Sequence, residues 1–224
     1  MDAKPYKQEK KENDIYLIPI VKPHTQTLLW LHGLGDSPLG YLDMFNSYES
    51  PIPFNFKIIL LCAPKVKFTL FNNQITTSWF DILEPGFRDE KSYNYSDVEK
   101  NKIKIINIIE EEVKLLNGNY NNIFIGGFSQ GACLSLDISF SYEKKLGGII
   151  SCSGVLFPQT NINDNNKDIK VFAAHGLYDN VIDINVSKKS YERILGFKNF
   201  EFHEYKMLHS IIEEECEDIG KFLK

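Results

Sequence analysis

Cysteine is scarce in this chain of 224 residues, which contains four, at positions 62, 133, 152 and 216. Their spacing matches no metal-binding motif, and three of them lie in apolar segments, so free, buried thiols are expected rather than metal ligands. The sequence also lacks a signal peptide and any apolar run long enough to span a bilayer. Together these absences favour a cytoplasmic protein.

An excess of positive charge is also absent, because 25 Lys and Arg residues stand against 30 Asp and Glu residues, for a net charge of −5. This balance excludes the basic footprint of a nucleic-acid-binding domain. In residues 1–14, four lysines balance four acidic residues, which argues against a basic membrane-binding arm. We expect residues 1–14 to be a disordered polar tail and residues 15–224 to form a single α/β domain, a length that can bury a sizeable core.

Apolar strands alternate with helical patterns over the rest of the chain. Strands are expected at residues 15–20, 27–32, 57–63, 147–154, 169–174 and 200–206, with another beginning at residue 123. Helices are expected at residues 38–48, 96–117 (opened by a capping box at 96–99), 184–195 and 210–223, with another beginning near residue 132. Residues 64–95 are expected to be irregular, and residues 155–168 to form a polar surface loop. This alternation predicts a mostly parallel central sheet with helices on both faces.

The sequence Gly-Phe-Ser-Gln-Gly at residues 127–131 follows one of these strands and leads into a helix. A G-x-S-x-G sequence in that context is typical of a nucleophile elbow, a strained turn that exposes the serine hydroxyl. Gly127 and Gly131 flank Ser129 because a Cβ atom at either position would collide with the neighbouring strand or helix. We therefore interpret Ser129 as a nucleophile, the alternative being a glycine-rich turn with an incidental serine.

A serine hydroxyl needs a base to become nucleophilic, and the base needs an acid that orients it. In this sheet architecture the acid and then the histidine follow the serine, in loops after later strands. Two histidines satisfy this order, His203 and His209. His203 lies within the last expected strand, whereas His209 lies in the loop that follows it, so His209 is the expected base.

Asp179 follows the strand that ends at residue 174 by a short loop, which makes it the expected acid. Asp183 stands directly before a helix and is expected to cap it. Asp164 and Asp168 precede the strand, and they therefore lie at its opposite end.

Two backbone N–H groups are expected to stabilise an oxyanion beside the nucleophile. One belongs to Gln130, at the start of the helix, and the other to Leu34, in the loop at residues 32–35. His32 and His175 are both expected to be structural histidines that steady their loops.

Apolar residues near the expected catalytic loops can form a groove for an acyl chain. The candidates are Trp79, Leu156, Phe157, Leu177 and Val181. Each of them is equally compatible with an ordinary core position, so this groove is the least specified part of the expected site.

Five short motifs occur in order at suitable spacing. They are Leu-His-Gly-Leu-Gly-Asp-Ser at residues 31–37, Ser-Trp-Phe-Asp at 78–81, Gly-Gly-Phe-Ser-Gln-Gly at 126–131, His-Gly-Leu-Tyr-Asp at 175–179 and His-Ser at 209–210. In combination they resemble the acyl-protein thioesterase family, the phospholipase/carboxylesterase group of α/β hydrolases. The resemblance implies an α/β-hydrolase fold in which Ser129 is the nucleophile, Asp179 the acid and His209 the base. It also implies that the amides of Leu34 and Gln130 are the oxyanion donors.

The reaction implied by the resemblance is hydrolysis of fatty-acyl thioesters on S-acylated (palmitoylated) proteins through an acyl-serine intermediate, with no metal or organic cofactor. The chain departs from the family at Ala132, where a second glycine is usual, and at residues 155–157, where an aromatic often follows Ser-Gly. Because nearly all of the 224 residues are needed for the sheet and its helices, we expect no large lid.

Two alternatives remain at this point. One is a small-molecule carboxylesterase or lysophospholipase with the same triad, and the other is a non-catalytic binding protein with an α/β-hydrolase fold. The intact serine, aspartate and histidine set argues against the second. The expected partners are an S-acylated protein, an acyl ester or a lysophospholipid, with transient contact to a membrane surface and no nucleic acid. The chain is expected to be a monomer or a weak homodimer.

Overall fold

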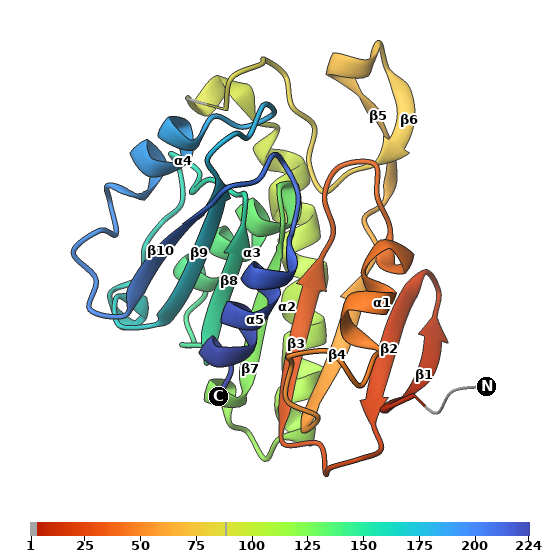
Figure 1. The fold of residues 1–224 in the computed structure, drawn as a ribbon. Coiled ribbons are helices and arrows are strands. Elements are labelled where there is room, and N and C mark those ends of the chain that lie inside the picture. The colour runs from red at the N-terminus through yellow and green to blue at the C-terminus, as the bar shows by residue number, and fades with distance from the viewer. Residues whose placement is uncertain (1–3, 88) are drawn as a thin grey trace.

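Strands and helices alternate along residues 4–87 and 89–224, the part of the chain that the computed structural model describes (Figure 1). The strands are β1 (Tyr6–Lys11), β2 (Asp14–Pro19), β3 (Gln26–Leu31), β4 (Phe56–Leu61), β5 (Lys65–Phe68), β6 (Gln74–Thr77), β7 (Ile123–Phe128), β8 (Gly148–Cys152), β9 (Lys170–Gly176) and β10 (Phe200–Tyr205). The α-helices are α1 (Leu42–Phe45), α2 (Tyr95–Leu115), α3 (Gln130–Ser141), α4 (Ile184–Tyr191) and α5 (Glu213–Phe222). The expected alternation of strands and helices is confirmed.

The main sheet has the strand order β1-β2-β4-β3-β7-β8-β9-β10. All pairs from β4 to β10 along this order are parallel, whereas β2 pairs antiparallel with both β1 and β4. The chain runs from β3 outward to β4 and then returns to β7 on the other side of β3. Open α/β sheets bind ligands at such a switch in strand order, outside the carboxyl ends of the strands. Here Leu31 of β3 pairs with Gly127 of β7, so the loop after β3 lies beside the turn after β7.

Helices cover both faces of the sheet, because successive side chains of a buried strand point to opposite faces. Leu28 and Trp30 of β3 belong to one core, with apolar side chains of α1 and α5. Leu29 and Leu31 belong to a second core, with side chains of α2, α3 and α4. Figure 1 shows α1 and α5 in front of the sheet and α2 and α3 behind it. The predicted mostly parallel sheet with helices on both faces is therefore confirmed.

The expectation of a disordered tail over residues 1–14 is wrong for β1, which extends the sheet at its edge. Residues 1–3 lie outside the described residues. Tyr6 is 4% exposed and its ring packs edge-on against Phe54, with centroids 6.3 Å apart, while most other side chains of β1 face solvent. An edge strand needs only backbone pairing and one buried anchor, and charged side chains suit its exposed side. Composition alone does not distinguish such a strand from disorder.

Helix boundaries differ from the expected ones. α2 begins at Tyr95, because the side chain of Asn94 accepts hydrogen bonds from the amides of Ser96 and Asp97; the capping box expected at residues 96–99 is therefore not the start. The helix expected at residues 38–48 is a 3₁₀ turn followed by α1. α4 ends before residue 195, and α5 begins after residue 210.

Two segments expected to lack regular structure contain ordered elements. Within residues 64–95, β5 and β6 form an antiparallel hairpin beside the main sheet. Residues 155–168 are not simply a surface loop, since their first three side chains are buried in the core. In the described chain neither segment supplies a helical lid over the sheet edge. Among all helices of the described residues, none is both long enough and apolar enough to cross a membrane.

Candidate active site

Ser129 lies at the turn between β7 and α3, with backbone angles of φ 54° and ψ −118°. This conformation is unfavourable for a residue with a side chain and costs roughly 1–3 kcal/mol, which the surrounding structure must offset. The turn is tight: a Cβ atom on Gly127 would lie 2.4 Å from the carbonyl oxygen of Leu31, and one on Gly131 would lie 2.0 Å from it. The expected collision at both glycines is confirmed, and the serine lies at the tip of a strained elbow.

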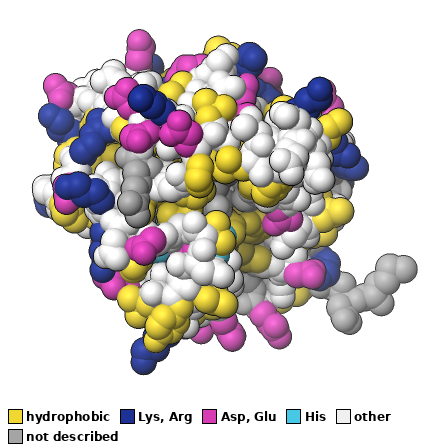
Figure 2. Space-filling model, turned by 90° about the horizontal axis from the view of Figure 1, so that it is seen from above, with side chains coloured by type: hydrophobic (Ala, Val, Ile, Leu, Met, Phe, Trp, Pro, Cys, Tyr) yellow, Lys and Arg dark blue, Asp and Glu magenta, His cyan; other side chains and the backbone are white. Residues whose placement is uncertain are grey.

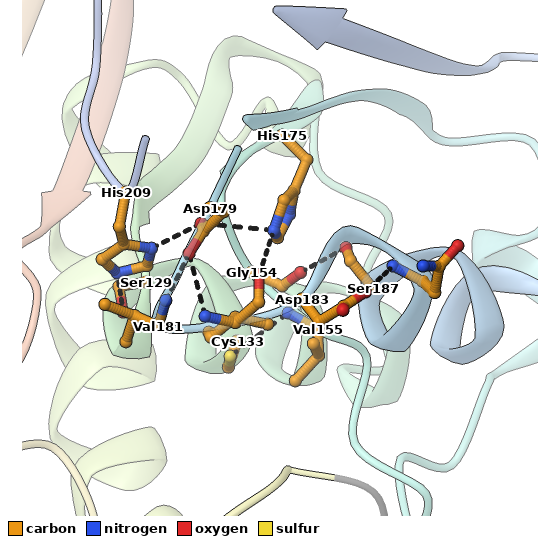
Figure 3. A network of polar contacts seen from close by, with 12 residues as sticks. Ser129, Cys133, Gly154, Val155, His175, Asp179, Val181, Asp183, Ser187 and His209 are labelled. Carbon is orange, nitrogen blue, oxygen red and sulfur yellow. Dashed lines mark hydrogen bonds and ion pairs between the residues drawn. The ribbon is translucent and has the colours of Figure 1, made fainter. Parts of the chain in front are cut away.

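Three loops far apart in the sequence bring Ser129, Asp179 and His209 together at the carboxyl edge of the sheet (Figure 3). Nε2 of His209 lies 2.9 Å from Oγ of Ser129, and Nδ1 of His209 lies 2.6 Å from Oδ2 of Asp179. A carboxylate only accepts hydrogen bonds, so Nδ1–H of His209 donates to Asp179. Nε2 is then free to accept the proton of the Ser129 hydroxyl, the arrangement that base-assisted nucleophilic attack requires.

The side chain of Asp179 is fully buried and its carboxylate is surrounded by donors. Oδ1 accepts from the amides of Val181 and Ile182, each at 2.9 Å. Oδ2 accepts from His209 and also lies 3.3 Å from Nε2 of His175. Burial alone would raise the pKa of this carboxyl, but the hydrogen bonds from the two histidines and the two amides outweigh it and hold the pKa well below its usual range. Asp179 is therefore ionised at neutral pH.

The other residues that the sequence offered for these roles lie elsewhere. His203 lies on β10, where its ring stacks on Phe172 with a centroid distance of 4.7 Å and Nε2 faces Glu201. Asp183 caps α4 by accepting a hydrogen bond from the amide of Asn185 at 2.7 Å, as predicted.

We expect Asp183→Ala to lower the free energy of unfolding by about 1 kcal/mol, because the first turn of α4 loses its cap. Asp183→Ser can still accept from the amide of Asn185 and should recover most of that loss. Chemical denaturation of the wild type and both variants measures the difference. An unchanged stability in Asp183→Ala, or a loss of turnover as large as that of Asp179→Asn, would contradict the capping role.

Leu34 and Gln130 line the same cavity as Ser129. The loop that carries Leu34 is fixed at the next residue, since the amide of Gly35 donates to the carbonyl oxygen of Thr77 at 2.8 Å. Gln130 is the first residue of α3, so the positive end of this helix dipole lies beside the serine. The backbone N–H groups of both residues are thus candidate donors to an oxyanion.

Buried side chains hold these two backbone segments in place. The Gln130 side chain accepts from the amide of Trp79 at 3.1 Å and donates to the carbonyl oxygen of Phe80 at 2.8 Å. His32 accepts from the amide of Ala63 at 3.0 Å through Nε2. Burial lowers the pKa of His32, which keeps the ring neutral and able to accept. The predicted structural role of His32 is confirmed.

Ser129 opens into a cavity of about 220 Å³. Its apolar wall is formed by Phe80, Ile82, Phe87, Cys133, Val181 and Ile182. A second cavity of about 510 Å³ shares Phe87 with it and adds the apolar side chains of Leu156, Pro158 and Val186. The second cavity reaches α4, and Asp183, Lys189 and Arg193 add charged groups to its otherwise mostly apolar lining.

The five residues predicted to line an acyl groove have different positions in the structure. Val181 lines the cavity at the serine, and Leu156 lines the second one. Trp79 and Phe157 line neither cavity and pack within the core instead, which corrects the prediction for both. Leu177 is 40% exposed and lines neither of these two cavities, so its part in binding an acyl chain stays a prediction.

Sequence reasoning missed most of the cavity wall. Phe80 lies in the Ser-Trp-Phe-Asp motif, whose residues are equally compatible with lining the site and with the core, and the structure places Phe80 rather than Trp79 in the cavity wall. Phe87, Cys133 and Ile182 reach the cavity only through the packing of segments far apart in the chain, and no local pattern distinguishes them from other apolar residues.

A third cavity, of about 350 Å³, shares His209, Phe128 and Asp36 with the cavity at the serine. Phe128, Met44 and Ile211 give it an apolar lining, and the carboxylates of Asp36 and Glu213 add negative charge. Figure 2 looks onto this edge of the molecule and shows histidine (cyan) partly exposed among hydrophobic side chains. His209 therefore borders two cavities, one of which also contains Ser129.

Glu215 on α5 is a buried carboxyl group outside the triad. Its side chain is 0% exposed, and its oxygens make no hydrogen bond of good geometry within the described residues, although the Cys152 thiol and the backbone of Ile212 lie close to them. Burial raises its pKa from 4.5 to about 7. An acid whose pKa rises on folding destabilises the native state progressively as the pH rises between those two values, and the penalty is constant above them.

Glu215→Gln should therefore become more stable relative to the wild type as the pH rises from 4.5 to about 7. The gain at alkaline pH is on the order of 3 kcal/mol, because glutamine resembles the protonated acid and cannot ionise. Urea denaturation of both proteins at several pH values measures it, with the exposed neighbour changed in Glu214→Gln as the control. A stability difference that does not vary with pH would contradict the raised pKa.

Almost the whole chain is similar to proteins of known family. The family model described as phospholipase/carboxylesterase matches residues 15–224. Acyl-protein thioesterase 1 of Saccharomyces cerevisiae is 32% identical over 228 residues, covering 95% of this chain and 97% of the relative. Acyl-protein thioesterase 1 of Candida albicans is 34% identical over 209 residues, covering 88% of this chain and 90% of the relative. The crystal structure of Arabidopsis thaliana SOBER1 superimposes with a TM-score of 0.75 at 27% identity, covering 88% of this chain and 97% of that one.

Proposed function

The chain belongs to the phospholipase/carboxylesterase family of α/β hydrolases, and on this basis we propose that it hydrolyses fatty-acyl thioesters on S-acylated proteins. It is a serine hydrolase. The observation that carries the proposal is the hydrogen-bonded series from Ser129 through His209 to Asp179, with distances of 2.9 and 2.6 Å, beside an apolar cavity. Two relatives that are 32% and 34% identical bear the name acyl-protein thioesterase 1, which supports a protein-bound acyl thioester as the substrate.

In the first step Oγ of Ser129 attacks the thioester carbonyl carbon while its proton passes to Nε2 of His209. The new C–O bond converts the carbonyl into a tetrahedral oxyanion. The ionised carboxylate of Asp179 stabilises the imidazolium through Nδ1–H and keeps the ring in the productive tautomer. The strained backbone at Ser129 keeps the hydroxyl exposed toward the incoming carbonyl.

The oxyanion is stabilised by the backbone N–H groups of Leu34 and Gln130, assisted by the positive end of α3. When the tetrahedral intermediate collapses, the C–S bond breaks and the leaving sulfur receives the proton from His209. An acyl ester on Ser129 remains. Water then attacks this ester with His209 again as the base, and the fatty acid leaves as Ser129 regains its proton.

The acyl chain is bound by the apolar cavity at Ser129 and the second cavity that shares Phe87 with it. Each buried methylene contributes about 0.8 kcal/mol, so longer chains bind better until the apolar surface ends. The protein part of the substrate stays outside and meets the cavity beside His209 that Asp36 and Glu213 line. The negative charge of these carboxylates repels phosphate, so a leaving group that carries phosphate binds less well in this cavity.

Transient contact with a membrane surface and a cytoplasmic location are also part of the proposal. Leu70, Phe71 and Ile75 are 40%, 46% and 70% exposed, and they belong to the segment that includes the β5–β6 hairpin. The loop of Leu34 is joined to this hairpin through the hydrogen bond between Gly35 and Thr77. The four cysteines are free, which is compatible with a reducing compartment.

The second candidate function is hydrolysis of oxygen esters, by a carboxylesterase or lysophospholipase with the same triad. The family description itself favours this alternative, because it names phospholipase and carboxylesterase activity. The two candidates differ in the leaving group and in the length of acyl chain that the cavities accept.

A matched set of substrates distinguishes them. We expect the highest kcat/KM for a long-chain acyl thioester on a peptide, with lower values for the matched oxygen ester, the lysophospholipid and short-chain esters. Ser129→Ala assayed in parallel gives the background rate for each substrate. A clear preference for short esters would favour the carboxylesterase, and a preference for the lysophospholipid would favour the phospholipase; either result would overturn the proposal. Activation at a triglyceride–water interface would contradict the lidless site.

A further inference from the structure

His175 is a fully buried histidine whose ring lies against the candidate catalytic acid. It is the second-last residue of β9 and its side chain is 0% exposed. Nε2 lies 2.8 Å from the carbonyl oxygen of Ile182 and 3.3 Å from Oδ2 of Asp179 (Figure 3). Both partners are acceptors, so Nε2 carries a proton; it donates to the carbonyl oxygen of Ile182 and lies within ion-pair distance of Asp179.

We propose that His175 is a positioning residue for Asp179, which orients the acid through the same carboxylate oxygen that receives the hydrogen bond from His209. This inference rests on the proposed triad and adds a fourth member to it. Oδ2 of Asp179 then accepts from His209 at 2.6 Å and from His175 at 3.3 Å. Because the carboxylate cannot rotate without losing one of these contacts, the direction in which it faces His209 is fixed.

The contact with Ile182 connects this histidine to the rest of the loop that carries the acid. The amide of Ile182 donates to Oδ1 of Asp179 at 2.9 Å, and the carbonyl oxygen of Ile182 accepts from His175. Both backbone groups of Ile182 are therefore hydrogen-bonded, its amide to Asp179 and its carbonyl oxygen to His175. These two bonds hold the loop at residues 179–182 in place. A purely apolar residue at position 175 could fill the space but could make neither hydrogen bond.

The second ring nitrogen argues against a packing role alone. Nδ1 of His175 is buried and has no hydrogen-bond partner among the described residues. An unpaired buried polar atom lowers stability, so an apolar side chain would suit a simple core position better. The donor at Nε2 is the feature that an apolar side chain lacks, and it lies between the carbonyl oxygen of Ile182 and the carboxylate of Asp179.

Two titratable groups face Asp179 and His175 from neighbouring elements. His209 contacts Asp179 from the loop after β10, and Glu215 on α5 lies near His175, with burial as the main cause of the raised pKa of Glu215. Within the triad, the donor from His175 stabilises the Asp179 carboxylate and so reduces the pull of that carboxylate on the His209 proton. Its loss should strengthen this pull and make His209 harder to deprotonate.

The test compares His175→Leu, which removes the donor, with His175→Gln, whose amide nitrogen can take the place of Nε2. We expect His175→Leu to lose roughly 10- to 100-fold in kcat with little change in KM, the size of effect that a small misplacement of a catalytic group produces. The acidic limb of its kcat/KM profile should move to higher pH. His175→Gln should recover most of kcat and the original limb, and His203→Gln serves as the control for a histidine substitution outside the site.

A double-mutant comparison separates positioning from folding. In the Asp179→Asn background, His175→Leu should lower kcat no further, because the acid through which it acts is already lost. The proposal would be overturned if His175→Leu and His175→Gln lost kcat equally, in step with their melting temperatures, and the acidic limb of the pH profile did not move. Additive losses of kcat in the double variant would also overturn it. Full activity in Ser129→Ala would instead refute the proposed triad, independently of His175.

Discussion

Ser129→Ala is expected to lose roughly 10⁴- to 10⁶-fold in kcat while keeping the fold, because no other group can form the acyl intermediate. The substitution leaves the strained turn, the flanking glycines and α3 in place. Alanine at this position also adopts the unfavourable φ of 54°, so the substitution does not relieve the backbone strain. Initial rates with a long-chain acyl thioester measure the loss of turnover, and a thermal melt shows whether the fold is kept.

His209→Ala should lose a similar factor, and the double variant should be little worse than either single one, because the members of a triad act as a unit. The matched control is His203→Ala, which removes the other histidine that follows the acid in the sequence and leaves Ser129 and its partners untouched. Its ring stacks on Phe172, so any effect should appear in stability rather than in turnover. If His203→Ala lost turnover while His209→Ala retained it, the assignment of the base would be wrong.

Asp179→Asn is expected to lose about 10⁴-fold in kcat, the effect known for an equivalent change of a buried triad aspartate in a serine protease. An asparagine in this position presents either an N–H to Nδ1 of His209 or an uncharged oxygen. In the first case His209 takes the wrong tautomer, and in the second the imidazolium loses its counter-charge. Steady-state kinetics across the pH range, with circular dichroism to check the fold, measure the loss.

The neighbouring aspartate is the control for this change. Asp183→Asn keeps an oxygen that can cap α4 and should retain near wild-type turnover, because Asp183 accepts from Asn185 and not from His209. A loss in Asp183→Asn comparable with that in Asp179→Asn would contradict the assignment of the acid.

The sequence was most informative where the chemistry depends on local structure. Ser129 could be predicted because a strained strand-to-helix turn needs glycine on both sides, and that requirement is visible in five consecutive residues. Asp179 and His209 could be predicted because chain order and the shared edge of a parallel sheet limit the choice. The structure brings these three side chains within hydrogen-bonding distance, although nothing in the sequence fixed those distances.

The acyl cavity could not be predicted in the same way. Trp79 and Phe80 are adjacent aromatic residues in one motif, yet Trp79 is in the core with its Nε1 donating to the carbonyl oxygen of His32, while Phe80 lines the cavity. Which of two neighbours faces a cavity depends on the segment that packs against them. Phe157 likewise packs at 5.1 Å from the ring of Phe80, behind the cavity wall rather than on it.

Edge elements escaped prediction for a different reason. β1 is held by backbone hydrogen bonds and the one buried anchor, Tyr6, so its charged sequence gives little sign of a strand. The cap of α2 was assigned two residues too late, because Ser96 and Asn94 are both good capping residues and only the contacts of the folded chain decide between them. His175 shows the same limit, since it stands in the same motif as Asp179 but only the loop conformation brings its ring against the carboxylate.

Capture of the acyl-enzyme tests the central claim most directly. The protein is mixed with a long-chain acyl-peptide thioester, quenched within the first turnovers and analysed by peptide mass spectrometry. The account predicts that the acyl group is found on Ser129, that it disappears as the free fatty acid is released, and that no adduct forms in Ser129→Ala. An acyl group on a different residue such as Cys133, or thioester hydrolysis by Ser129→Ala at the wild-type rate, would contradict it.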